Sequence, residues 1–363
     1  MKAAILYEVN KLLSVEDIQI DDPQGQEVLV KLVGSGVCHS DLSAIKGDIP
    51  QPLPIVLGHE GAGIVEKVGP GVTMLQPGDH VILMVSFSCG KCRYCVEGKP
   101  TMCVGNMDTL AMASLPGGAK RLHKGDQELG HFMGVASFAE FSIVNERQAV
   151  KIRDDAPLEV VCLLGCGVST GIGASIYTAG VRPGESIAIY GCGGVGLSAV
   201  MGAKLAGAGK TIAIDTLDQK LKMAKELGAD YVINAKQEDP ASKVMEITGG
   251  GADYAIECIG NVDVMATAMG SIHGGGKCVI MGSAPIGNML SIAPYEFLMG
   301  KTITGGVQGS IKPFIDIPRF VDLFMDGKLP IDKLITKKYR LDQVNEAFEA
   351  LEKGQLMRSV IKL

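Results

Sequence analysis

The sequence predicts an α/β protein with two domains, one an irregular β-barrel and the other a doubly wound parallel sheet. The length is the first observation, because 363 residues correspond to two domains at ~150 residues each. The second is a change of pattern near residue 167, where short β-type runs begin to alternate with helical segments. The third is the glycine count of 48, which has no collagen-like period and so indicates turns and close backbone approaches.

Residues 1–165 are predicted to be mostly β. Short apolar runs alternate with turns such as Pro77-Gly78-Asp79, and the clearest runs are 28–33, 61–68 and 80–85. Residues 104–137 are rich in Gly, Met and Ala and show little periodicity. For that stretch we expect a long loop, which is either functional or a surface insertion.

The second part of the chain alternates strands and helices. The expected strands are 186–190, 211–214, 231–233, 254–258 and 277–281. The expected helices between them are 194–207, 217–227, 239–247 and 261–270. This alternation predicts a parallel sheet that is covered on both faces. The tail adds an amphipathic helix over 344–351 and a closing strand over 359–363.

Charge and hydropathy exclude two classes of function. The net charge is −6, and the densest basic cluster, residues 337–340, is too small to bind a nucleic acid by its charge. No stretch of ~18 apolar residues exists, so no membrane span is expected. The N-terminal apolar run is too short for a secretory signal, and we therefore expect a cytoplasmic protein.

A glycine-rich run predicts a dinucleotide-binding loop. Tyr190 ends a β-type run, and Gly191-Cys192-Gly193-Gly194-Val195-Gly196 follows before a helical stretch. These glycines allow a tight turn, the approach of a pyrophosphate and close packing of helix on strand. Asp215, nineteen residues beyond Gly196, suits a ribose 2′-hydroxyl and favours NAD over NADP. The alternative is a glycine-rich turn without a ligand.

Four of the ten cysteines form a local cluster. Cys89, Cys92, Cys95 and Cys103 lie within fifteen residues. Four thiolates in tetrahedral geometry suit a structural zinc ion, whose closed shell leaves no position for a substrate. An iron–sulfur centre is less favoured, because Val104 rather than proline follows the last cysteine. Free thiols are the remaining alternative.

Three dispersed motifs are informative only together. Cys38 lies in GVCHSD at 36–41, His59 lies in GHEG at 58–61, and Cys166 lies in LGCG at 164–167. Taken one at a time, a cysteine is most often a small buried side chain, and a histidine is usually only hydrogen-bonded.

In their order along the chain these motifs resemble the zinc-containing alcohol dehydrogenases of the medium-chain dehydrogenase/reductase superfamily. The resemblance runs from about Val28 to Arg358 and rests on GVCHSD, GHEGAGxVxxVG, CxxCxxCx7C and GCGGVG with Asp215. It implies a GroES-like catalytic domain at 1–167 and 311–363 and a Rossmann NAD-binding domain at 168–310. Cofactor and substrate would meet in the cleft between these domains.

The resemblance implies two zinc ions per chain, NAD as cofactor and a catalytic site. Cys38, His59 and Cys166 match the ligands of the catalytic zinc, and Glu60 matches a glutamate that lies beside the zinc or exchanges onto it. Ser40 matches the hydroxyl that binds the substrate oxygen. In such a site the zinc polarises the alcohol and the nicotinamide accepts a hydride.

The resemblance also implies cofactor contacts. Thr170 and Val195 match residues at the nicotinamide end, Lys220 matches one near the adenosine ribose, and Arg358 and His39 match contacts to the phosphates. Two positions depart from the best-known animal members, since Ser43 replaces their outer proton-relay histidine and His39 replaces an arginine. Water is the alternative route for the proton, and histidine would make cofactor binding weaker or sensitive to pH.

A few positions in the sequence bear on the identity of the substrate. The Cys38–His39 pair resembles the branch that oxidises benzylic and allylic alcohols, and Val85 matches a pocket position with room for a bulky primary alcohol. S-(hydroxymethyl)glutathione or polyol dehydrogenation are the alternatives within the family, although the Met- and Ala-rich stretch favours an apolar substrate, with Met102, Met107 and Met112 as mouth residues. A non-enzymatic nucleotide-binding protein is the alternative of another class. A homodimer joined through the nucleotide-binding sheets is expected, with a tetramer as the alternative.

Overall fold

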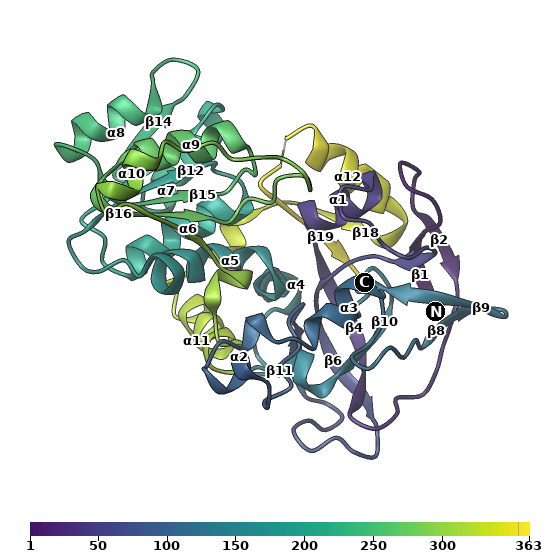
Figure 1. The fold of residues 1–363 in the computed structure, drawn as a ribbon. Helices are drawn as coiled ribbons and strands as arrows, with labels where there is room; N and C mark the ends of the chain where they lie inside the picture. The colour runs from purple at the N-terminus through teal and green to yellow at the C-terminus, as the bar shows by residue number, and fades with distance from the viewer. Residues whose placement is uncertain (355) are drawn as a thin grey trace. The chain divides into compact units, whose positions relative to one another are not determined.

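The chain divides into two units, each with its own sheets. The computed structural model describes residues 1–354 and 356–363, apart from the side chain of Asp108. Unit 1 comprises Met1–Cys166 and Lys312–Leu363, and unit 2 comprises Gly167–Ile311. Figure 1 shows that unit 1 is rich in strands and that unit 2 holds one sheet with helices around it. The α/β class predicted from the sequence is confirmed.

Unit 1 contains two sheets. The order in the first is β2 (Ser14–Asp17), β1 (Lys2–Leu6), β5 (Ile55–Val56), β9 (Gln127–His131), β8 (Leu122–Lys124) and β3 (Gln19–Ile20). The order in the second is β11 (Ala149–Lys151), β7 (His80–Leu83), β6 (Glu60–Val68), β4 (Glu27–Val37), β19 (Arg358–Lys362) and β18 (Ile335–Arg340), and β10 (Phe141–Asn145) also pairs with β4.

Strand β4 brings distant segments of unit 1 together. Gly36 in β4 lies opposite Glu60 at the start of β6 and opposite Val360 in β19. The pairing of β4 with β6 shifts register at two places, which bends the strand. Because Cys38 follows β4 directly, the ends of β4, β6 and β19 meet at one place.

The helical parts of unit 1 are short, with one exception. The α-helices are α1 (His39–Lys46), α2 (Arg93–Val96), α3 (Asn106–Ala111), α4 (Leu158–Val161), α11 (Pro313–Met325) and α12 (Val344–Glu352). The 3-10 turns are η1 (Pro100–Met102), η2 (Phe132–Gly134), η3 (Glu146–Gln148), η4 (Cys162–Gly165), η7 (Ile331–Leu334) and η8 (Leu341–Gln343). Helix α12 covers the predicted 344–351 helix, whereas no helix was predicted for α11.

The expectation of one long loop over 104–137 is wrong. That stretch contains α3, the hairpin β8–β9 and the turn η2. The hairpin is held on both sides by distant strands, since β3 pairs with β8 and β5 pairs with β9. These partners are far away in the sequence, so periodicity within 104–137 could not indicate the strands.

Unit 2 is built on one parallel sheet of six strands. Its order is β14 (Tyr231–Asn234), β13 (Lys210–Asp215), β12 (Ser186–Tyr190), β15 (Ala252–Glu257), β16 (Ile272–Ile280) and β17 (Thr302–Gly305). Every residue of β12 is buried, so side chains on both faces of this central strand are covered. The chain order reverses between β12 and β15, which defines the topological switch point of the sheet.

The helices of unit 2 form two packed groups. In the first, α5 (Gly167–Gly173) contacts α6 (Gly194–Leu205), which contacts α7 (Asp218–Leu227). In the second, α8 (Pro240–Thr248) contacts α9 (Val262–Gly270). The π-helical turn η5 (Ala174–Ala179), α10 (Pro294–Leu298) and the turn η6 (Val307–Ser310) complete the unit. The strands and helices predicted here agree with the structure to within a few residues at most ends.

Within residues 1–354 and 356–363, no single helix is both long enough and apolar enough to cross a membrane. Only the bent pair Leu158–Gly165 and Gly167–Ala179, counted together, reaches that length and composition.

Candidate active site

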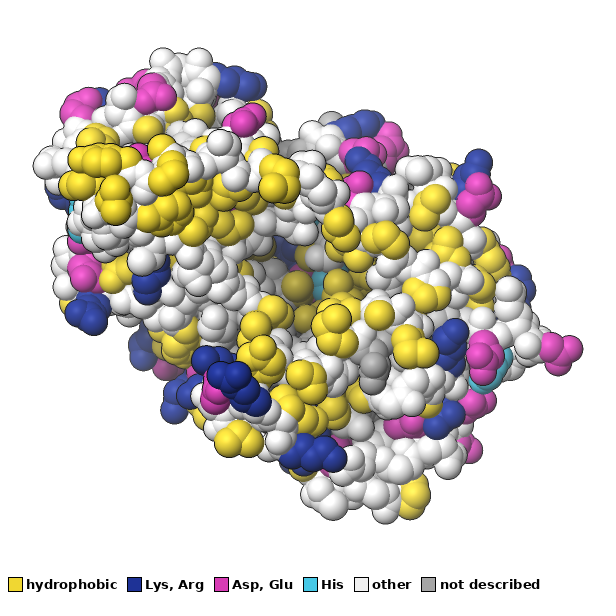
Figure 2. All heavy atoms as spheres, viewed as in Figure 1, with side chains coloured by type: hydrophobic (Ala, Val, Ile, Leu, Met, Phe, Trp, Pro, Cys, Tyr) yellow, Lys and Arg dark blue, Asp and Glu magenta, His cyan; other side chains and the backbone are white. Residues whose placement is uncertain are grey.

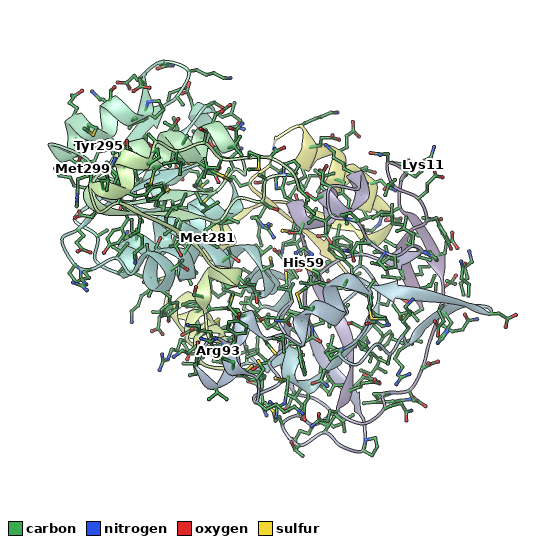
Figure 3. The ribbon with its side chains drawn as sticks, viewed as in Figure 1. Lys11, His59, Arg93, Met281, Tyr295 and Met299 are labelled. Atoms are coloured by element: carbon green, nitrogen blue, oxygen red, sulfur yellow. The ribbon has the colours of Figure 1, made fainter. Side chains whose placement is uncertain are left out.

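Four side chains predicted from separate motifs converge in unit 1. The ligand atoms of Cys38, His59, Glu60 and Cys166 all lie within 4.8 Å of one another. Cys38 caps α1 after β4, His59 and Glu60 lie at the start of β6, and Cys166 follows η4. Figure 3 shows His59 inside unit 1. The convergence of two sulfurs, one imidazole and one carboxylate is the donor set of a catalytic zinc site.

The orientation of His59 is set by an aspartate. The Nδ1 atom of His59 lies 3.1 Å from Asp41 Oδ1, which also accepts the backbone N–H of Gly58 at 2.9 Å. The opposite ring nitrogen, Nε2, is buried and has no hydrogen-bond partner among the described residues. A ring held by a carboxylate at one nitrogen and left open at the other is the arrangement of a metal-ligating histidine. Phe132 packs against this ring edge-on, with centroids 5.6 Å apart.

The residues of this cluster shift the pKa values of Cys38 and His59. The hydrogen bond from Cys166 and the nearby His59 lower the pKa of Cys38 well below the usual range, against the effect of burial. Burial alone would lower the pKa of His59, but the charges of Asp41 and Cys38 outweigh it and raise that pKa. The site therefore favours a Cys38 thiolate, the form that binds a metal.

Glu60 forms an ion pair with a second buried charged side chain. Its Oε2 forms an ion pair with Nη2 of Arg358, the first residue of β19, and both side chains are almost completely buried. A Cβ atom at Gly36 would overlap this carboxylate, so glycine is required where β4 passes the pair. The resemblance placed Arg358 at the cofactor phosphates, and the structure shows it bound to Glu60.

The remaining predicted residues of this region lie along α1. The Oγ atom of Ser40 lies 3.9 Å from Cys38 Sγ, so Ser40 borders the cluster. Ser43 is half-buried one turn further along the helix, and His39 is exposed at its first position. The structure thus brings Ser40 to the site and places Ser43 and His39 on the same helix.

Asp41 is not among the residues predicted for this site. It follows Cys38 by three residues, which places both on one face of α1, and its side chain is completely buried. The available indication was the carboxylate within GVCHSD, one helical turn after a candidate ligand. Its partner His59 could not be inferred, because the contact joins α1 to the residue before β6, 18 positions further along the chain.

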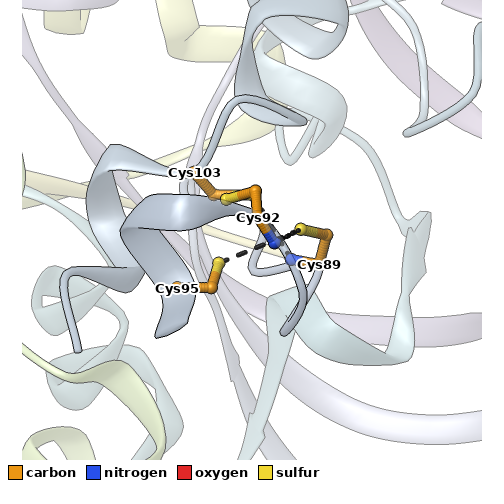
Figure 4. A group of neighbouring side chains, drawn as sticks. All are labelled: Cys89, Cys92, Cys95 and Cys103. Carbon is orange, nitrogen blue, oxygen red and sulfur yellow. Dashed lines mark hydrogen bonds between the residues drawn. The ribbon is translucent and has the colours of Figure 1, made fainter. Parts of the chain in front are cut away.

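The four clustered cysteines form a second centre in unit 1. Cys89 Sγ and Cys95 Sγ are 4.0 Å apart, and Cys92 Sγ and Cys103 Sγ are 3.9 Å apart (Figure 4). Four sulfurs around a zinc ion with Zn–S bonds of 2.3 Å would be separated by about 3.8 Å. The spacing in the structure therefore fits a tetrahedral all-thiolate site.

Backbone amides favour thiolates at this centre. The N–H of Cys92 donates to Cys89 Sγ and the N–H of Cys89 donates to Cys103 Sγ, both at 3.3 Å. Amide hydrogen bonds lower the pKa of Cys92 to about 6, whereas burial raises that of Cys103 to about 12. The Cys92 thiol at this centre therefore ionises readily, whereas the Cys103 thiol needs a nearby cation to ionise.

The glycine-rich run forms the turn between β12 and α6 in unit 2. Gly191 has a φ of 94°, and a Cβ atom at Gly196 would overlap the carbonyl oxygen of Gly191. A Cβ atom at Gly193, by contrast, would meet no atom within 4 Å. Helix α6 begins at Gly194, so its first amides border this open space. The turn fits a pyrophosphate at a helix N-terminus.

Asp215 ends β13 beside this turn. Its Oδ2 accepts the N–H of Cys192 at 2.8 Å, and its Oδ1 accepts the N–H groups of Thr216 and Leu217 at 2.7 and 3.1 Å. These bonds fix the carboxylate next to the glycine-rich turn, where the ribose of a dinucleotide is expected. A carboxylate in this position disfavours a 2′-phosphate.

Three other predicted cofactor residues also lie in unit 2. A Cβ atom at Gly171 would overlap the carbonyl oxygen of Val195, so the segment after Thr170 packs against the start of α6. Thr170 is nearly buried, and Val195 is half-buried. Lys220 lies on α7 and is half-buried.

Comparisons with known proteins agree with this geometry. The family model described as "Alcohol dehydrogenase GroES-like domain" matches residues 24–154, and the model described as "Zinc-binding dehydrogenase" matches residues 194–325.

Three known proteins illustrate the similarity. The chain is 44% identical to S-(hydroxymethyl)glutathione dehydrogenase of Synechocystis sp., with 99% of each covered. It is 42% identical to alcohol dehydrogenase class-3 of Drosophila melanogaster, with 99% of this chain and 97% of that protein covered. The crystal structure of benzyl alcohol dehydrogenase from Acinetobacter calcoaceticus has a TM-score of 0.95 at 38% identity, covering 100% of this chain and 99% of that one. The similarity therefore includes the sequences of both units.

Proposed function

Because this chain belongs to the zinc-containing alcohol dehydrogenases, we propose that it transfers a hydride between NAD and a primary alcohol to give the aldehyde. The observation that carries this proposal is the convergence of Cys38, His59 and Cys166 around an unpartnered buried imidazole nitrogen. These three residues hold the catalytic zinc, and Cys89, Cys92, Cys95 and Cys103 hold the structural zinc. When bound, zinc polarises the substrate oxygen and NAD accepts the hydride.

The chain's own residues prepare this site. Asp41 holds His59 so that Nε2 faces the cluster. Glu60 lies beside the ligands, and Arg358 balances its charge. Ser40 binds the substrate hydroxyl and takes its proton, and Ser43 passes the proton outward along α1. A hydroxyl relays protons less readily than an imidazole, so water assists at Ser43.

Unit 2 binds the dinucleotide. The amides of Gly191, Gly193, Gly194 and Gly196 and of the α6 N-terminus hold the pyrophosphate, while Asp215 binds the adenosine ribose. Lys220 lies near that ribose, and Thr170 and Val195 contact the nicotinamide end. His39 contributes to phosphate binding, and a histidine at this position makes that binding depend on pH, whereas Arg358 pairs with Glu60.

We propose an apolar primary alcohol, allylic, aromatic or of medium length, as the substrate. Helix α3 packs on η2, and Phe132 of η2 touches the His59 ring, so the segment around α3 lies one layer from the zinc ligands. That segment exposes large apolar side chains: Met102, Val104, Met107, Leu110 and Met112. Between Lys99 and Lys120 the sequence contains neither lysine nor arginine.

S-(hydroxymethyl)glutathione is the second candidate, because two of the similar proteins carry that name or the class-3 name. Glutathione has two carboxylates, and a site built for it needs cations to pair with them. The apolar segment around α3 offers none, whereas the names of the two similar proteins support S-(hydroxymethyl)glutathione, so the two candidates are equally supported. A polyol is the third candidate and requires polar partners for several hydroxyls.

A substrate panel tests this proposal. The zinc-loaded protein is assayed for NAD reduction with ethanol, benzyl alcohol, geraniol, butanediol, sorbitol and a mixture of formaldehyde and glutathione. We expect the highest kcat/KM with benzyl alcohol or geraniol. Highest activity with the glutathione mixture would assign the second candidate, and the Cys166→Ala variant should be inactive with every substrate while still binding NADH.

We propose that two copies join through unit 2. Strand β17 ends the sheet order, and the neighbouring surface around α10 exposes Ile286, Met289, Tyr295, Phe297, Leu298 and Met299. Figure 2 shows hydrophobic side chains gathered over this end of unit 2, and Figure 3 shows Tyr295 and Met299 there. Light scattering should give a dimer, or a tetramer built from such dimers. Leu298→Asp should dissociate it, and a monomeric parent would refute the proposal.

The expected cytoplasmic location remains a proposal. It is supported by the ten cysteines, none of which forms a disulfide in the described structure, as a reducing compartment favours. Fractionation of cells that express a tagged chain would test it.

A further inference from the structure

Glu257 lies at the carboxyl ends of the central strands of unit 2, where three loops begin. It is the last residue of β15, and it lies opposite Tyr190 of β12 on one side and Ile280 of β16 on the other. The glycine-rich turn follows Tyr190, and two further loops follow Glu257 and Ile280. Its side chain is completely buried. A carboxylate is thus enclosed at the topological switch point, where dinucleotides bind in sheets of this kind.

This carboxylate accepts hydrogen bonds from the backbone of the loop after β15. Its Oε1 accepts the N–H groups of Ile259 and Gly260, both at 2.8 Å, and that of Asn261 at 3.4 Å. Asn261 is the N-cap of α9, so the bonds span the whole connection from strand to helix. Hydrogen bonds to an ionised acceptor are about twice as strong as those to a neutral one. The loop is therefore held more firmly than an amide side chain would hold it.

The same residue also fixes the loop after β16. The backbone carbonyl of Glu257 accepts the N–H groups of Met281 and Gly282 at 2.8 and 3.0 Å. A Cβ atom at Gly282 would overlap the N atom of Gly260, and a Cβ atom at Gly260 would lie 2.5 Å from the carbonyl oxygen of Ser283. The two loops thus touch backbone to backbone, and a movement of one displaces the other. Met281 marks this loop in Figure 3.

The loop after β15 also contacts the glycine-rich turn. A Cβ atom at Gly191 would lie 2.5 Å from Cγ1 of Ile259, so the Ile259 side chain covers the start of that turn. The Ile259 side chain is otherwise 55% exposed. The position of Ile259 therefore depends on the amide bonds made by Glu257.

Retention of a charge here has a cost. Burial raises the pKa of Glu257, and the amides of Gly260 and Ile259 oppose that effect. A glutamine would accept the same amide bonds without burying a charge. A buried glutamate is thus costlier than a glutamine here, and it lies where its hydrogen bonds order the loops that face a ligand.

We propose that Glu257 is a positioning residue for the nicotinamide half of the dinucleotide, acting through the loops 258–261 and 281–283. This inference rests on the proposed function. Asp215 on β13 assigns the adenosine half to one side of β12, so the nicotinamide half extends to the other side, over the ends of β15 and β16. Glu257 itself does not touch the cofactor, because its side chain is enclosed below both loops.

The test compares two ligands that differ only in the nicotinamide half. Dissociation constants of NADH and of ADP-ribose are measured by calorimetry for the zinc-loaded parent and for Glu257→Gln, which keeps the accepting oxygen and removes the charge. We expect NADH to bind about tenfold more weakly to the variant, while ADP-ribose binding changes less than about twofold.

Asp253→Asn is the matched control. Asp253 lies near the opposite end of β15, where it accepts the N–H and the Oγ–H of Ser186 and faces His273. This variant loses a carboxylate from the same strand, so it should shift the melting temperature without changing either dissociation constant.

Several results would overturn the inference. Equal weakening of both ligands in Glu257→Gln would show general damage to the site, and a lowered melting temperature with both constants unchanged would show a purely structural role. If the variant does not fold, hydrogen exchange of the parent decides, since NADH must protect the amides of 259–261 and 281–282 beyond the protection given by ADP-ribose. If the parent protein binds neither NADH nor ADP-ribose, the proposed function is refuted as well. This outcome is distinguishable from a failure of the inference alone, in which the parent still binds both ligands.

Discussion

Glu60 and Arg358 form a buried ion pair although 298 residues separate them in the sequence. The pair lies beside the four converging ligand atoms, and its two members come from β6 and β19 on either side of β4. Taking two charges out of water is costly, and their mutual attraction offsets that cost only while both are present. The integrity of the site therefore depends on a contact between distant parts of the chain.

Removal of one partner should destabilise the protein strongly. We expect Arg358→Met to lower the free energy of unfolding by about 3 kcal/mol, because it removes the guanidinium that pairs with the buried Glu60 carboxylate. The double variant Glu60→Gln/Arg358→Met should recover part of this loss. Urea denaturation of the zinc-loaded proteins measures both. Arg153→Met, which removes an exposed ion pair with Asp155, is the control and should change little.

Loss of one clustered cysteine should remove one zinc ion. Cys92→Ser breaks the tetrahedral set of four sulfurs, so we expect the zinc content to fall by about one ion per chain and the melting temperature to decrease. Elemental analysis after desalting measures the content. Cys278→Ala, a buried cysteine outside both groups, should retain the parental zinc. Unchanged zinc in Cys92→Ser would argue against a metal at this centre.

Substitution of Asp215 should relax the choice of cofactor. Asp215→Asn removes the charge that repels a 2′-phosphate and weakens the bonds to the ribose hydroxyls. We expect kcat/KM with NAD to fall ten- to hundredfold, as for the loss of about 1.5–3 kcal/mol of charged hydrogen bonding, and NADP to become a measurable cofactor. Steady-state kinetics with both cofactors measure this. If the preference for NAD persisted in full, another residue would have to set it.

His131 should make stability depend on pH. It is completely buried in β9, its Nε2 accepts the N–H of Arg121, and burial lowers its pKa to about 3. The unfolded chain binds this proton at a pKa of about 6.5, so between these values it holds one proton more than the folded chain. The free energy of unfolding therefore falls as the pH decreases, by up to about 1.4 kcal/mol per pH unit from this residue.

A neutral substitute tests this dependence. His131→Gln keeps a polar side chain that does not titrate, so its stability should fall less than that of the parent between pH 7 and pH 5. Urea denaturation at three pH values measures the difference in slope. The same slope in the parent and in His131→Gln would assign the acid sensitivity to other groups.

Local patterns predicted five of the six strands of the unit 2 sheet and the helices between them, but not β17, α5 or α10. Its strands are short apolar runs because both faces of the sheet are covered, and the helices between them follow regular spacing. The turn from Gly191 to Gly196 is specified by steric demands within six residues, so its position could be read from the sequence. The zinc ligands, by contrast, could be grouped only by resemblance to a family, since Cys38, His59 and Cys166 meet through sheet pairing.

Contacts between distant segments account for what the sequence did not predict. The β8–β9 hairpin depends on β3 and β5, and the Asp41–His59 bond depends on how α1 packs. The same holds for Arg358, whose partner Glu60 is defined by the strand order around β4. Such pairings cannot be inferred from the spacing of residues along the chain.

The order of the strands in unit 1 also determines when the site is completed during synthesis. Cys38, His59 and Cys166 are translated before unit 2, which is a continuous segment and can fold as soon as it leaves the ribosome. Strand β19, with Arg358, is translated only after unit 2. Until then Glu60 lacks its ion pair with Arg358, and β4 lacks one of its three neighbouring strands. Maturation of the zinc site in the nascent chain is therefore coupled to the release of its last strand.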